Sequence, residues 1–147
     1  MENNFKKSEE ILAEIYRNAQ LALQSIVDIL PEVEAEDLKE EIMREHEVYE
    51  DISARASMLA RDRGLELKEP NVMKKAMMWG SIKMNTLTDN TRSHIAQMMI
   101  QGTVMGITSL KSSQSQMSEG ADKEIVDLLK EFIKIEEGFE KTLKGYL

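Results

Sequence analysis

Three ionisable residues interrupt apolar helical stripes, and their side chains could bind a metal ion or transfer protons. Glu45 and Glu136 each occupy a position that the spacing of the stripe reserves for a hydrophobic residue. His94 lies at the same three- and four-residue spacing as Met84, Leu87, Thr91 and Met98, which would place all five on one side of a helix. If the helices align by their middles, the two carboxyl groups and the imidazole lie within about one or two turns of one another. Such a set suits iron or another divalent transition metal, or proton transfer by carboxyl groups with raised pKa values.

Three further polar residues are expected to support this site. Asn18 lies at the same level of the first helix, Tyr49 follows Glu45 by one turn, and Thr91 precedes His94 by one turn. Three interpretations stay open: a buried polar layer that sets helix register, residues at the stripe edge that reach solvent, and a metal or catalytic site. The residues alone favour the polar layer.

The elements that must position these side chains are helices. Four segments carry apolar residues at alternating three- and four-residue steps, the spacing of an amphipathic helix. The predicted helices span residues 5–30, 32–63, 81–112 and 121–146. Pro31 stops the first helix, and Gly64 is a natural C-terminal cap for the second. Because a helix cannot bury its apolar face alone, we expect an all-α protein in which residues 1–147 form a single four-helix bundle domain.

The connection between the second and third helices is long. Residues 70–79 predict a short extra helix within a crossover, separated from the third helix at Gly80. The polar run 86–93 is the less favoured candidate for this break, because its side chains compete for backbone hydrogen bonds. Residues 111–120 are expected to form a loop before the last helix.

Composition and charge exclude several classes of protein. The chain has 147 residues, no cysteine and a net charge of -8, so we expect neither disulfides nor thiolate metal sites nor nucleic-acid binding. Residues 1–10 are too polar for a signal peptide, and the apolar segment 95–110 is shorter than the ~20 residues of a membrane span. We therefore expect a cytoplasmic protein without a membrane-spanning helix.

The third helical region is rich in methionine and contains two glycines at helical spacing. Seven of the 11 methionines lie within residues 70–112, and their spacing favours core packing over binding of cuprous copper. Gly102 and Gly106 form a small-xxx-small pattern that permits close approach of another helix. The sequence therefore predicts self-association, with a dimer favoured.

The helix number and lengths, together with the stretch SIKMNTLTDNTRSHIAQMMIQG at residues 81–102, make the chain resemble the ferritin-like superfamily. The resemblance is strongest to the small bacterial, spore-coat-type members, and it implies a bundle with a crossover. Metal-binding members carry a Glu in two helices and Glu-x-x-His in the other two. Here Val48 and Phe139 stand where those histidines would follow Glu45 and Glu136, so the full di-iron ligand set is missing.

These observations predict a non-enzymatic ferritin-like bundle with a structural or protein-interaction role and no cofactor. The alternative is a metal-binding or redox bundle that uses Glu45, His94 and Glu136. The partner protein, if it differs from the chain itself, is not specified by the sequence.

Overall fold

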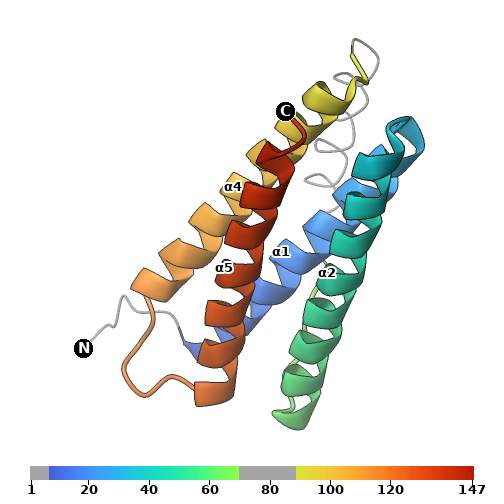
Figure 1. Cartoon of the computed structure of the whole chain (residues 1–147). Helices are drawn as coiled ribbons and strands as arrows, with labels where there is room; N and C mark the ends of the chain where they lie inside the picture. The colour runs from blue at the N-terminus through green and yellow to red at the C-terminus, as the bar shows by residue number, and fades with distance from the viewer. Residues whose placement is uncertain (1–6, 70–88) are drawn as a thin grey trace.

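The structure, a computed structural model, describes residues 7–69 and 89–147, and every regular element among them is helical (Figure 1). The elements are α1 (Ser8–Ile29), the 3-10 helix η1 (Leu30–Glu32), α2 (Glu36–Asp62), α4 (Arg92–Ser115) and α5 (Lys123–Lys144). The predicted all-α four-helix bundle is confirmed. The short extra helix expected over residues 70–79 lies outside the described residues.

The contacts between helix ends define the direction of each helix. Arg92, which begins α4, pairs with Asp37 at the start of α2, with Nη1 and Oδ2 2.6 Å apart. At the other end, Arg63 binds Asp122, and the backbone N–H of Asp122 donates to the Ser8 hydroxyl over 2.8 Å. α2 and α4 therefore run parallel to each other and antiparallel to α1 and α5 (Figure 1). The end of α2 and the start of α4 therefore lie at opposite ends of the bundle.

The core is the apolar stripe of each helix turned toward a common axis. α1 packs most extensively against α2, and α4 against α5, while α5 also contacts α1 and α2. Large buried apolar side chains come from all four helices: Ile11, Leu12, Ile15, Ile26, Leu38, Ile42, Ile52, Ile95, Leu110, Ile125, Leu128 and Phe132. Burial of these stripes is the main stabilising contribution, because isolated helices of this length are marginal in water.

The helix ends follow local sequence signals. Gly64 adopts a φ of 65°, the left-handed conformation that favours glycine, and the N–H of Leu65 donates back to the Ala60 carbonyl over 2.8 Å. Pro31 stands within η1, directly after α1. None of the described helices is long and apolar enough to cross a membrane.

The start of the third helix differs from the prediction. Residues 89–91 are not helical, and α4 begins at Arg92, so the helix boundary lies in the polar run 86–93 and not at Gly80. The Thr91 hydroxyl caps the helix by accepting the His94 N–H over 3.3 Å. α4 also continues to Ser115, through the first half of the predicted loop.

Candidate functional site

Glu136 lies in the bundle core, where α5 faces α2. Its side chain is 3% exposed, and its Oε2 accepts a hydrogen bond of 3.1 Å from the Tyr49 hydroxyl. The Tyr49 ring packs edge-on against Phe132 and Phe139, with centroids 6.1 and 5.4 Å apart. Burial raises the pKa of Glu136 to about 8, although the hydrogen bond from Tyr49 acts in the opposite direction. At neutral pH this carboxyl group is mostly protonated.

Gly106 of α4 lies close to both Glu136 and Asn18 of α1. A Cβ at Gly106 would lie 3.7 Å from Oε1 of Glu136 and 3.8 Å from Oδ1 of Asn18. The Asn18 amide nitrogen donates to the Glu14 carbonyl over 2.8 Å and to the Ser109 hydroxyl over 3.3 Å. These two bonds fix the amide so that its carbonyl oxygen, an acceptor, is the atom at Gly106.

Glu45 of α2 is the most deeply buried ionisable residue in the described part of the chain. Its side chain is 0% exposed, and neither carboxyl oxygen has a hydrogen-bond partner among the described residues. Burial is the main cause that raises the pKa of Glu45 to about 10, and the nearby Glu41 and its charge act in the same direction. The nearby Arg44 lowers this pKa, whereas Glu136 raises it. Glu45 is therefore a neutral acid at pH 7.

Glu41 and Arg44 connect this buried acid to the surface of α2. The Arg44 guanidinium donates two hydrogen bonds to Glu41, of 2.9 and 2.7 Å, and lies 5.4 Å from the centroid of the Phe139 ring. Burial acts to raise the pKa of Glu41, but the hydrogen bonds and charge of Arg44, together with the nearby Glu45, outweigh it and lower the pKa. Of these two acids, Glu41 therefore carries the negative charge, one turn before the neutral Glu45.

Glu45, Glu136, Tyr49 and Asn18 together form one polar group of the core, which we call the acid layer. Two acids from different helices hold protons there, and one phenol and one amide complete the polar surroundings. Because both acids are neutral near pH 7, the layer stores protons and would introduce charge into an apolar interior if they were lost.

His94 lies outside the acid layer, contrary to the prediction from sequence. It is in the first turn of α4, whereas the α4 residue beside Glu136 is Gly106, about 18 Å further along the helix at 1.5 Å per residue. The His94 Nε2 is buried and has no hydrogen-bond partner among the described residues. The predicted start of this helix is wrong: α4 begins at Arg92, eleven residues after Ser81, so His94 falls in its first turn and not near its middle.

Thr91 also lies away from the acid layer. Its side chain is exposed and serves as the N-cap of α4, so its role is in helix termination and not in the core. Among the residues that the structure describes, no group of three or more His, Asp or Glu side chains could hold a metal ion. The structure therefore gives the proposed Glu45, His94 and Glu136 metal site no geometric support.

The prediction also missed three residues around the acid layer. Glu41 precedes Glu45 by four residues and therefore shares its face of α2. This spacing could have predicted that the two side chains are neighbours. Gly106 and Ser109 lie on the inner side of α4. The two sides of this helix differ little in hydrophobicity, so the sequence did not indicate which side faces the core.

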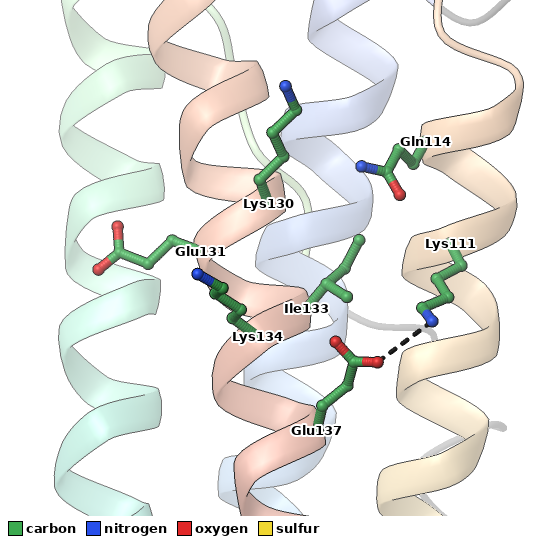
Figure 2. Close-up of a pocket in the computed structure, with 7 residues that line it drawn as sticks. All are labelled: Lys111, Gln114, Lys130, Glu131, Ile133, Lys134 and Glu137. Carbon is green, nitrogen blue, oxygen red and sulfur yellow. Dashed lines mark ion pairs between the residues drawn. The ribbon is translucent and has the colours of Figure 1, made fainter.

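A shallow groove of about 590 Å³ runs along the outer surface between α4 and α5 (Figure 2). Its lining consists of Lys111, Gln114, Lys130, Glu131, Ile133, Lys134 and Glu137. Lys111 and Glu137 form an ion pair of 3.2 Å across the groove, and Glu131 binds Arg55 of α2. The groove is a solvated surface of mixed charge, separate from the acid layer.

The acid layer thus rests on its own geometry, with a defined hydrogen-bond donor for Glu136 and none for Glu45. Comparison of the chain with protein-family models, with curated proteins and with solved structures returns no match.

Proposed function

We propose that the protein is a non-enzymatic helical bundle that acts through protein interaction, and that it forms a dimer through the outer side of α4. We call this surface the α4 face. Its members are the exposed residues Gln97, Gln101, Gly102, Val104, Met105 and Thr108. The observation that carries the proposal is that this face is exposed and apolar in part, yet contains no charged residue.

Charge is missing from α4 over most of its length. No Asp, Glu, Lys or Arg occurs between Arg92 and Lys111, although charged residues make up 31% of the chain. Val104 and Met105 are 40% and 73% exposed and adjacent in sequence. A solvated helix face in a protein of this composition is ordinarily charged, so a neutral face with adjacent exposed apolar residues supports an interface.

Other exposed apolar residues do not form such a face. Met43 and Met58 of α2 are each about half exposed, at 52% and 53%, but each is flanked by charged side chains on the same helix. Isolated apolar residues of this kind are normal on protein surfaces. The contrast separates the α4 face from the outer side of α2.

Electrostatics favour a second copy at this surface. Each chain carries a net charge of -8, so two copies repel each other over most of their surfaces. α4 contains no acidic residue, whereas α1, α2 and α5 all do. Contact between two α4 faces is therefore the approach least opposed by repulsion between like charges.

The resemblance to the ferritin-like superfamily belongs to this proposal. α2 and α4 run parallel and are separated by a long connection in the sequence, an arrangement typical of ferritin-like bundles. This arrangement supports the resemblance without implying a metal. The metal-binding alternative has no specific observation in its favour, because the histidine lies away from the two acids.

Sedimentation equilibrium of the purified protein and of Met105→Glu tests the proposal. We expect the unmodified protein to be a dimer and Met105→Glu to be a monomer, because the new carboxylate would be buried against its own copy. Met58→Glu is the matched control, since it adds the same charge at an exposed methionine of α2, and we expect it to remain a dimer. A monomeric unmodified protein, or equal behaviour of the two variants, would contradict the proposal.

A further inference from the structure

We propose that the acid layer is a proton-operated switch: the folded bundle holds Glu45 and Glu136 as neutral acids, and loss of their protons loosens the packing of α4 against α1 and α5. This inference concerns the core and goes beyond the proposed dimer at the α4 face. It rests on the hydrogen-bond groups around each carboxyl and on the absence of a cation within the layer among the residues that the structure describes.

The surroundings of Glu136 suit an acid better than a carboxylate. An ionised carboxylate has about four acceptor sites to satisfy, but the Tyr49 hydroxyl is the single donor to it in the described structure. On the side of Gly106, Asn18 presents its carbonyl oxygen, and its two bonds to Glu14 and Ser109 oppose a rotation that would present the amine. Asn18 therefore offers no second hydrogen-bond donor to an ionised Glu136.

The surroundings of Glu45 have the same character. No donor among the described residues reaches either of its oxygens, and its side chain is fully buried. The ionised Glu41 lies one turn away on the same helix, so a second negative charge at Glu45 would be repelled. A protonated Glu45 avoids this repulsion and can donate its proton toward Glu41.

The helices packed around the layer supply almost no compensating charge. α2 contributes Glu41, Arg44 and Tyr49, and Tyr146 lies near its Glu41 and Glu45. α1 contributes the neutral Asn18, with Glu14 one turn away. On α5, Phe132, Ile133 and Phe139 flank Glu136, and Glu140, one turn later, pairs with Lys144. α4 contributes Thr103, Gly106 and Ser109, none of which titrates. Among the described residues, Arg44 is the cation whose charge acts on Glu45, and Glu41 already binds it.

Gly106 marks the position at which we expect the helix packing to open. Glycine leaves no side chain over the Glu136 carboxyl, and Gly106 itself is only half-buried. Water that hydrates an ionised Glu136 would enter most easily at this position, which requires α4 to move away from α1 and α5. The expected opening is therefore local to the middle of α4.

Urea unfolding at about pH 6 and about pH 9 tests the switch, with Glu45→Gln, Glu136→Gln and Glu47→Gln compared with the unmodified protein. An unfolded glutamate releases its proton near its ordinary pKa, whereas the folded acids retain theirs, so the folded state binds more protons and rising pH favours unfolding. Over this range each retained proton lowers the folding constant up to about tenfold per pH unit. Glutamine mimics the neutral acid, so we expect the first two variants to lose part of this pH dependence.

Glu47→Gln is the matched control, because Glu47 is an exposed glutamate of the same helix and should leave the pH dependence unchanged. Hydrogen exchange of the unmodified protein, corrected for the intrinsic effect of pH, provides a test that needs no variant. We expect amides near Gly106 to exchange faster, relative to those of α2, at the higher pH. Stability that is flat or rises with pH, glutamine variants that keep the full pH dependence, or unchanged exchange near Gly106 would each overturn the proposal.

Discussion

α5 and α4 pack side by side as antiparallel neighbours, yet their outer surfaces differ in charge and in apolar patterning. α5 has a sharp apolar stripe and a charged opposite side, and it is held to α2 by the ion pair between Glu131 and Arg55. α4 has neither a charged outer side nor a sharp stripe, and its exposed surface includes Met105. The apolar and charged sides of α5 are both accounted for by contacts within the chain. The outer side of α4 makes no such contacts among the residues that the structure describes, so it is available for a partner.

Truncation of a large side chain on each helix gives the largest contrast. Phe132→Ala removes a fully buried ring of α5 that contacts Tyr49, and we expect a loss of about 3–5 kcal/mol in the free energy of unfolding. Met105→Ala of α4 should change it by about 0.5 kcal/mol or less, because the side chain is exposed. Urea unfolding at a protein concentration low enough for the protein to be monomeric measures both free energies. Similar losses for the two variants would show that Met105 is part of the core.

The caps of the two helices give a smaller contrast. Asp122 accepts the N–H of Glu124 over 3.0 Å and also binds Arg63 through both carboxylate oxygens, whereas Thr91 only caps its helix. We expect Asp122→Ala to cost about 2 kcal/mol and Thr91→Ala about 1 kcal/mol in thermal unfolding. A larger loss for Thr91→Ala would mean that this residue makes core contacts as well.

Two exposed glycines give the smallest contrast in stability. A Cβ at Gly102 of α4 or at Gly138 of α5 would meet no atom of the described residues within 4 Å. Alanine at either position should therefore raise the free energy of unfolding by about 0.5–1 kcal/mol through helix propensity. Only Gly102→Ala should also weaken the dimer, as measured by sedimentation equilibrium. Equal effects of the two variants on dimer dissociation would remove Gly102 from the α4 face.

The same difference between helices explains how far the sequence predicted the site. Glu45 and Glu136 occupy regular positions in the strong four-three patterns of α2 and α5, so burial of these acids followed from their neighbours. The depth of a residue in the bundle also depends on where its helix begins. For α4 that boundary lies in a polar run, and an error of eleven residues displaced His94 by about three turns.

The helix directions could not be predicted from periodicity. A stripe at three- and four-residue steps looks the same whichever way the helix runs. The direction of α4 is identified by long-range pairs at the bundle ends, of which Arg92 with Asp37 spans 55 residues of sequence. The number and class of the helices followed from local patterns, whereas the crossover depended on contacts between distant segments.

The most direct test of the acid layer is a pH titration of the glutamate side-chain carboxyl carbons by ¹³C NMR, with the two resonances assigned through Glu45→Gln and Glu136→Gln. We expect both to keep the chemical shift of a protonated acid at neutral pH, with Glu136 titrating at about 8 and Glu45 above it. Titration of both carbons near the ordinary glutamate pKa of about 4.3 would contradict the account.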